Sequence, residues 1–382
     1  MANKRISDFG FGLKVAAVAV AALSCGVVLA DQEVKIGFAS PMTGAEANWG
    51  KDNENSAKMA IEELNKKGLV AGGQKLHFSL QSEDDAGDPR QGTVVAQRLV
   101  DSKIVAMVGH FTSGVTIPAS RVYHEANVPQ FSVAVNSAYT NQGFNNVFRL
   151  SAVDTKVGPA LAEFTKKQLG AKTVALIDDR TAYSQGLVDQ FEAAAKKLGL
   201  KVVRREYTDQ KSTDMLPILT SLRASKPDAI FVGLADAQAA TFARQYKQLG
   251  LKAKIIGGDM FQTDQFLKLA ENNGEGFMSG VAGGVLTQRA EGRTFLQKYK
   301  AKYNAEPLAY GPQHYDAVMM IGEAIKKSGS TDANKLIGAL RNVQYKGAVT
   351  DYAFDAKGDL KAAPITIYEV KAGQWFAKSV VH

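Results

Sequence analysis

The stretch from which the fold can be inferred is Ile104-Val-Ala-Met-Val-Gly-His-Phe-Thr-Ser-Gly114. Its first five residues predict a buried strand, Gly109 a sharp turn, and the hydroxyl-bearing residues that follow the start of a helix. In an open parallel sheet, ligands bind beyond the carboxyl ends of the strands, and the first turn of a helix offers unpaired N–H groups to an anion. We therefore expect Thr112, Ser113 and Gly114 to hold a small anionic group such as a carboxylate. The alternative is that these residues serve only as a helix cap.

The same unit of strand, polar loop and helix recurs on both sides of this stretch. Further strands are predicted at Val34–Phe38, Leu76–Leu80, Thr173–Ile177, Asp228–Val232 and Lys254–Ile256. Such an alternation is typical of mostly parallel sheets flanked by helices. Because it restarts near Arg149, the sequence predicts an α/β protein built from two similar halves. Gly-containing turns in the C-terminal tail favour antiparallel strands at a sheet edge.

The N-terminal segment, residues 1–30, has the features of a secretory signal peptide. A basic start precedes the apolar run Val15–Leu23, and Val28–Ala30 has the small-residue spacing of a cleavage site. Cleavage is expected before Asp31, so the mature chain would be periplasmic. The remaining 352 residues (382 − 30) exceed what one core usually supports, so two domains are expected. Cys25 is the only cysteine, so the mature chain is expected to fold without disulfides.

The net charge of +8 at pH 7 is spread over the chain in short pairs such as Lys66-Lys67. These pairs are typical of solvated helix ends, so no nucleic-acid partner is expected. An acidic segment, Glu83–Asp88, precedes Pro89 and could hold a divalent metal. Its spacing matches no calcium loop, and Asp88 before Pro89 is a good helix start. We therefore expect turn formation and helix capping, with no metal and no cofactor.

Catalytic motifs are incomplete throughout the sequence. There is no G-x-S-x-G elbow, no Walker loop, no H-E-x-x-H pair and no dinucleotide fingerprint after a strand. His110 lies close to Ser113, but it belongs to the same turn and no orienting acid is evident. The sequence therefore favours a binding protein over an enzyme.

Polar and aromatic residues fall at predicted strand ends in both halves of the chain. They are Trp49, Ser113, Asn136, Tyr183, Asp236, Asp259 and Tyr310. Carboxylates, a hydroxyl-bearing loop and aromatic walls suit a zwitterion with an apolar side chain.

Several of these residues lie in motifs that resemble the periplasmic Leu/Ile/Val-binding proteins of ABC transporters. The motifs are Pro41-Met-Thr-Gly44, Asp84-Asp85, Gly109-His110, Tyr183-Ser-Gln-Gly186, Gly257-Gly-Asp259 and Lys357-Gly-Asp359. The resemblance covers essentially the whole mature chain. It implies two Rossmann-like lobes joined by a three-strand hinge, with a ligand cleft that closes between them. We expect an N-terminal lobe of residues 31–150 plus 283–355 and a C-terminal lobe of residues 151–282 plus 356–382.

The resemblance also implies a role for each candidate residue. Ser113 and its neighbouring N–H groups, together with Ala134 and Asn136, would hold an α-carboxylate, and Asp259 would pair with the α-ammonium. The other candidates are Asp236 as a second acid, and Trp49, Tyr183 and Tyr310 as aromatic walls of the side-chain pocket.

The chain departs from the family pattern at four positions. Asn136 stands where the family's best-known members have threonine, and Ala235 stands where they have tyrosine. Gly87 and Thr112 stand where a disulfide is often found. The pocket changes leave the identity of the ligand open.

The expected function is delivery of a branched-chain or related amino acid to the membrane permease of an ABC importer by a monomeric binding protein. The ligand would dock first on Ser113 and Asn136, and closure would add Tyr183 with Asp236 or Asp259. Three alternatives are a ligand-sensing subunit of a receptor, a binding protein for an amide or aromatic acid, and an exported hydrolase built on Ser113 and His110. The fold alone does not separate transport from sensing, because function resides in sites and partners.

Overall fold

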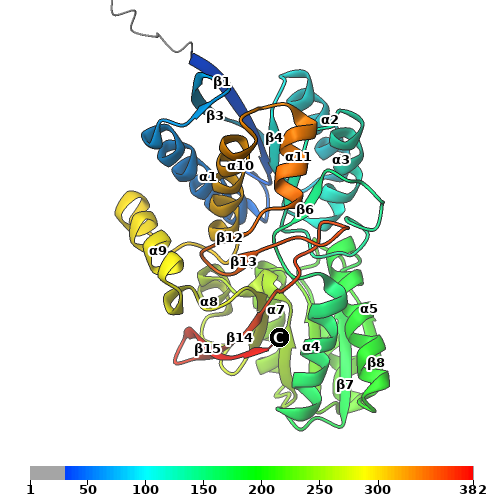
Figure 1. The fold of residues 1–382 in the computed structure, drawn as a ribbon. Coiled ribbons are helices and arrows are strands. Elements are labelled where there is room, and N and C mark those ends of the chain that lie inside the picture. The colour runs from blue at the N-terminus through cyan, green and yellow to red at the C-terminus, as the bar shows by residue number, and fades with distance from the viewer. Residues whose placement is uncertain (1–30, 382) are drawn as a thin grey trace, which may run out of the picture.

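The computed structural model describes residues 31–381, so the predicted signal peptide lies outside the described residues. The chain forms two lobes, each a sheet flanked by helices (Figure 1). This arrangement confirms the predicted α/β fold. Within residues 31–381, no helix is long and apolar enough to cross a membrane.

The sheet of the first lobe has the strand order β2-β3-β1-β4-β5-β6. All neighbouring strands are parallel except β2 and β3. The strands are β1 (Asp31–Ser40), β2 (Val70–Ala71), β3 (Gln74–Asp84), β4 (Ala106–Gly109), β5 (Gln130–Ser132) and β6 (Val147–Arg149). The helices of this lobe are α1 (Ala47–Lys67), α2 (Pro89–Asp101), α3 (Ser113–Glu125), α9 (Ala290–Tyr303), α10 (Gly311–Ser328) and α11 (Ala333–Arg341).

The sheet of the second lobe has the strand order β15-β14-β11-β10-β9-β7-β8. The strands are β7 (Thr173–Asp178), β8 (Lys201–Tyr207), β9 (Ala229–Gly233), β10 (Lys254–Gly257), β11 (Met278–Ala282), β14 (Ile365–Lys371) and β15 (Gln374–Val381). The helices are α4 (Asp154–Lys167), α5 (Ala182–Lys197), α6 (Leu216–Ser225), α7 (Asp236–Gln248) and α8 (Asp264–Ala270), with the 3-10 turn η1 (Asp259–Phe261). The antiparallel pairing of β14 with β11 and β15 confirms the predicted edge strands.

Three connections join the lobes. The chain enters the second lobe after β6, returns after β11 through the 3-10 turn η2 (Leu286–Gln288), and crosses again after the hairpin β12 (Tyr345–Lys346) and β13 (Asp351–Tyr352). Backbone hydrogen bonds tie the connections together: Arg149 N–H donates to the Gly358 carbonyl at 2.8 Å, and Gly283 N–H to the Pro364 carbonyl at 2.7 Å. These are the three crossovers that the resemblance implied. The residue limits predicted for each lobe stay predictions.

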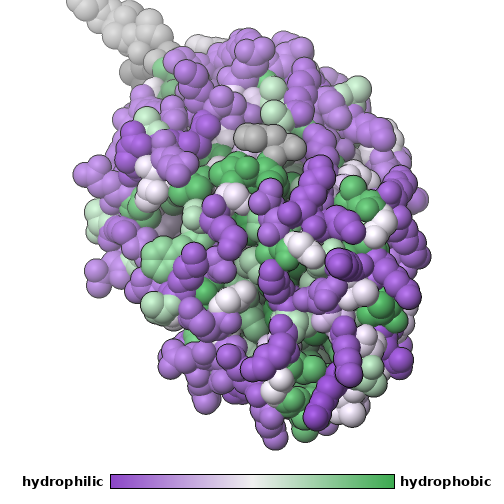
Figure 2. Space-filling model, turned by 90° about the horizontal axis from the view of Figure 1, so that it is seen from below, coloured by the Kyte–Doolittle hydropathy of each residue, from purple (hydrophilic) through white to green (hydrophobic). Residues whose placement is uncertain are grey.

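Apolar side chains cover both faces of each sheet. In the first lobe, Val34, Ile36 and Phe38 of β1 are fully buried, as expected for a central parallel strand. The edge strand β15 exposes Phe376 and Val380, with Lys378 between them, and a charge on an edge strand discourages further strand pairing. Viewed from below, the second lobe shows hydrophobic residues interspersed among hydrophilic ones (Figure 2).

Candidate functional site

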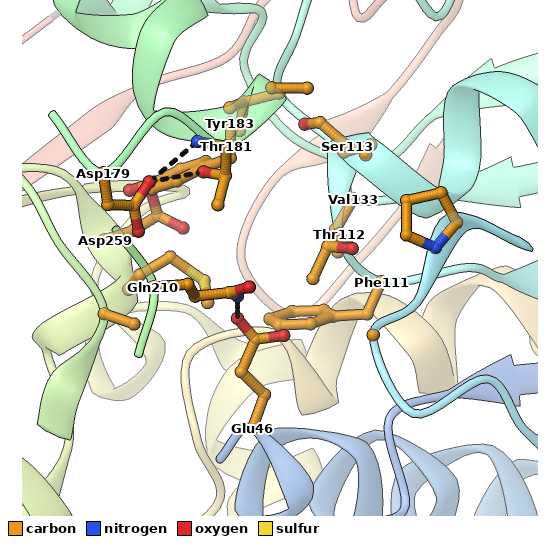
Figure 3. Close-up of a pocket in the computed structure, with 18 of the residues that line it drawn as sticks. Glu46, Phe111, Thr112, Ser113, Val133, Asp179, Thr181, Tyr183, Gln210 and Asp259 are labelled. Atoms are coloured by element: carbon orange, nitrogen blue, oxygen red, sulfur yellow. Dashed lines mark hydrogen bonds between the residues drawn. The ribbon is translucent and has the colours of Figure 1, made fainter. Parts of the chain in front are cut away.

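A cavity of about 370 Å³ lies between the lobes, lined by residues that follow the strands of both sheets. The first lobe contributes the start of α3, the loop after β5 and Tyr310. The second lobe contributes the loop 179–183 after β7, Ala235 after β9, and Asp259 with Met260 after β10. Figure 3 shows Ser113 and Thr112 on one side and Asp179, Tyr183 and Asp259 on the other. The carboxyl ends of parallel strands therefore converge on this cavity, as such sheets favour.

The start of α3 lies at the cavity wall, and no side chain of the described residues caps its first backbone amides. Gly109 has φ of 128°, and a Cβ there would lie 2.2 Å from the Ala39 carbonyl oxygen, so only glycine fits the turn after β4. The cap residue Thr112 makes no side-chain hydrogen bond to the helix. The first backbone hydrogen bonds onto Thr112 come from Val115 and Thr116, so the amides of Ser113 and Gly114 precede the helical ladder. An anion in the cavity would meet these amides and the positive end of the helix dipole.

The other predicted carboxylate-binding residues differ in where they lie. Ala134 lines the cavity beside the start of α3. Asn136 does not line it: its backbone N–H lies 3.3 Å from Ser113 Oγ, and its side-chain amide donates to the Ala182 carbonyl at 2.6 Å. Asn136 therefore links the two lobes, and its contact with a ligand stays a prediction.

Asp259 lies at the opposite wall, where two tyrosines hold its carboxylate. Tyr183 donates to Oδ1 at 2.9 Å, and Tyr310 donates to Oδ2 at 2.6 Å. Because Tyr183 belongs to the second lobe and Tyr310 to the first, Asp259 is bonded to both lobes. Burial raises the pKa of Asp259, and the two tyrosine hydrogen bonds oppose that rise.

Two other predicted site residues lie outside the cavity lining. Trp49 is fully buried and stacks on Phe111, with ring centres 5.5 Å apart, so it supports the wall from behind. Asp236 is buried and accepts hydrogen bonds from Asn48 at 3.0 Å and Thr263 at 3.3 Å. Direct contact of either residue with a ligand stays a prediction.

The lining residues that sequence reasoning missed include Glu46, Asp179 and Gln210. Glu46 is the N-cap residue of α1 but makes no side-chain capping bond, and its Oε1 accepts from Gln210 Nε2 at 3.2 Å. Asp179 Oδ1 accepts from the backbone and the hydroxyl of Thr181. Burial first, and then the charges of Asp179 and Asp236, raise the pKa of Glu46 to about 7. Glu46, Asp179 and Gln210 each lie in a polar segment that follows a strand, and this position was the signal in the sequence that could have identified them.

The acidic segment before α2 forms turns and caps, as predicted. Asp88 accepts from the amides of Arg90 and Gln91, and Asp84 accepts from the amide of Met42. No group of three or more metal-ligating side chains is found among residues 31–381.

The sequence-based view that His110 lacks an orienting acid was wrong. Asp85 Oδ2 lies 2.7 Å from His110 Nδ1, and both side chains are fully buried. The other ring nitrogen of His110 lies 3.1 Å from the hydroxyl of Tyr123, not from Ser113. The pair therefore supports the α2–α3 layer and is not directed at a nucleophile.

The cavity lies between two α/β lobes. One wall, the start of α3, suits an anionic group, and the opposite wall, Asp259, suits a cationic group. These features define a bilobed binding protein for small solutes. The chain belongs to the periplasmic binding protein family, whose model matches residues 33–374. This is a family of solute-binding proteins of transporters, which confirms the prediction of a binding protein over an enzyme.

The chain is similar along nearly its whole length to named relatives. It is 32% identical to an amino acid binding protein of Pseudomonas aeruginosa, over 88% of this chain and 90% of that one. It is 30% identical to Leu/Ile/Val-binding protein homolog 1 of Brucella abortus, over 93% and 95%. Among solved structures, the branched-chain amino acid transporter substrate binding protein LivJ of Streptococcus pneumoniae, in complex with isoleucine, has a TM-score of 0.84 at 26% identity, over 92% and 99%. The resemblance inferred from the sequence is thus confirmed.

Proposed function

We propose that this protein captures a branched-chain or related α-amino acid between its lobes and delivers it to the membrane permease of an ABC importer. The observation that carries the proposal is the pairing of the open start of α3, from one lobe, with the carboxylate of Asp259, from the other, around one cavity. The distance between an α-carboxylate and an α-ammonium is fixed, so a zwitterion engages both lobes at once. The binding of isoleucine by LivJ supports the same class of ligand.

Binding proceeds by docking and closure. The carboxylate meets Ser113 and the first amides of α3, while the second lobe brings Asp259 to the ammonium. Phe111 and Val133 line the apolar part of the cavity and would contact the side chain. A micromolar Kd corresponds to about −8 kcal/mol, which a few charge-assisted hydrogen bonds in a closed cleft can supply.

We infer the setting of this function from the family and the sequence. The description of LivJ as the substrate binding protein of a transporter supports a membrane permease as the partner. The mature protein begins near Asp31 after removal of residues 1–30, and it acts in the periplasm as a monomer. Mass measurement of the exported protein and sedimentation of the purified chain test these two statements.

Calorimetric titration of the ligand-stripped mature protein with a panel of α-amino acids tests the function. Ser113→Ala combined with Asp259→Ala should abolish binding without unfolding the chain, because both charged ends of the zwitterion lose a partner. Asp101→Ala, an exposed acid on α2, is the matched control and should bind as the parent does. Unchanged affinity in the double variant would overturn the site, and a panel without any binder would overturn the ligand class.

A further inference from the structure

The cavity contains more acidic residues than the α-ammonium of a zwitterion needs as partners. Its charged lining residues are Glu46, Asp179, Asp259 and Arg180. Arg180 is exposed, and its guanidinium lies over the ring of Tyr207, 5.4 Å from the ring centre. Tyr207 is itself 46% exposed, so the positive charge of Arg180 sits at the outer surface. Three carboxylates therefore line the cavity, and the one cation among its described lining residues, Arg180, lies over the Tyr207 ring.

Glu46 is the least satisfied of these acids. The residue is 7% exposed, and one oxygen of its carboxylate accepts a hydrogen bond from Gln210. No residue within 31–381 donates a hydrogen bond to the other oxygen, Oε2 (Figure 3). Asp259, by contrast, has a tyrosine hydroxyl on each oxygen. Oε2 of this nearly buried carboxylate opens onto the cavity, where water in the empty protein or a donor group of a ligand can hydrogen-bond to it.

Asp179 lines the same cavity as Glu46, from the opposite lobe. Its charge acts on Glu46, and its own Oδ1 is held in position by Thr181. Water leaves the cleft when the lobes close on a ligand. If the side chain of the ligand is neutral, the two carboxylates lose their hydration and gain no charged partner in return. A positively charged group between them would be attracted to both.

We propose that Glu46 and Asp179 form a subsite for a basic nitrogen at the end of the ligand's side chain. This inference rests on the proposed function, since the start of α3 and Asp259 then hold the α-carboxylate and the α-ammonium. The preferred ligand is accordingly an α-amino acid with a protonated side-chain amine or guanidinium. Phe111, whose ring lies beside Glu46, contacts the aliphatic part of that side chain (Figure 3).

The test compares two ligands of the same shape. Ornithine and norleucine differ only in a terminal ammonium in place of a methyl group. Calorimetric titration of the stripped mature protein at pH 8, above the pKa of Glu46, should give at least tenfold tighter binding of ornithine. In Glu46→Gln, which keeps the acceptor for Gln210, that preference should fall to within threefold. Asp179→Asn is the second variant and should reduce it in the same direction. Glu62→Gln, an exposed acid on the same helix, should retain it.

The outcomes separate this inference from the proposed function. Norleucine or leucine binding as tightly as ornithine would overturn the subsite and leave the amino-acid site intact. Glutamine binding more tightly than ornithine would also overturn it, because an amide would then be the preferred donor. A preference for ornithine that survives in both variants would assign the charge recognition to other residues. Absence of binding by every α-amino acid would refute the proposed function itself.

Discussion

Glu46→Gln should stabilise the unliganded protein at alkaline pH. The carboxyl group of Glu46 has its pKa raised from an ordinary 4.5 to about 7, mainly by burial. Above pH 7 the folded state must hold the ionised form in the cavity, whereas below pH 4.5 the acid is protonated in both states and costs nothing. The folded chain thus loses stability as the pH rises from about 4.5 to about 7, and the loss is complete above 7. The full difference corresponds to about 3 kcal/mol, since each tenfold change in proton affinity is worth about 1.4 kcal/mol.

Urea unfolding of ligand-stripped protein measures this difference. The Gln variant should be more stable than the parent by about 3 kcal/mol at pH 8 and by about half of that at pH 5.5. Asp179, Asp236 and Asp85, the acids that act on Glu46, are present in both proteins, so their own titration largely cancels in the comparison. Glu62→Gln, on the exposed face of the same helix, should change stability by less than about 0.5 kcal/mol at either pH. Equal stability of the parent and the Glu46 variant at pH 8, or a gain that does not shrink at pH 5.5, would refute the reasoning.

Two further substitutions test how the lobes are joined. Gly186→Ala places a Cβ 2.5 Å from Nδ2 of Asn136, which belongs to the other lobe, so the Asn136 side chain must move and the contact between the lobes should open. We expect about 1–3 kcal/mol weaker ligand binding and a larger radius of gyration by small-angle scattering; an unchanged radius would contradict this. Asp359→Asn removes the charge partner of the fully buried Arg149, 2.7 Å away at the crossover strands. It should lower the free energy of unfolding by about 3 kcal/mol in urea, and a loss below about 0.5 kcal/mol would contradict the buried-pair argument.

Most of the architecture follows from local patterns in the sequence. The apolar run before Gly109, the turn and the hydroxyl-bearing loop correctly predicted a strand and the start of α3, although β4 begins at Ala106, two residues after the expected start. Asp88 before Pro89 correctly predicted a helix cap. These features depend on neighbouring residues, whose preferences act over one or two turns of chain.

The site could be predicted only in part, because burial depth and long-range contacts are not local properties. Trp49 was expected to line the cavity, but Phe111 lines it and Trp49 stacks on Phe111. The sequence around Trp49 does not indicate that another aromatic residue covers it. Asp85 was not assigned to His110, since the two residues are 25 positions apart. Glu46 was overlooked because a glutamate at the start of a helix is ordinary in sequence. Only the packing of both lobes reveals that its carboxylate is buried at a cavity that Asp179 also lines.

The energetic cost of Glu46 and the proposed ligand preference have one physical origin. A buried, underpaired carboxylate lowers the stability of the empty protein, and that same unfavourable energy is relieved when a cation enters the cavity. An ammonium beside Glu46 lowers its pKa and favours the ionised form, whereas a neutral side chain excludes water and raises the pKa further. The two classes of ligand therefore shift the pKa of Glu46 in opposite directions. If Glu46 serves the ligand, the substitution that stabilises the empty protein must weaken its selectivity; if Glu46 is only a structural acid, stability rises and selectivity stays as it was.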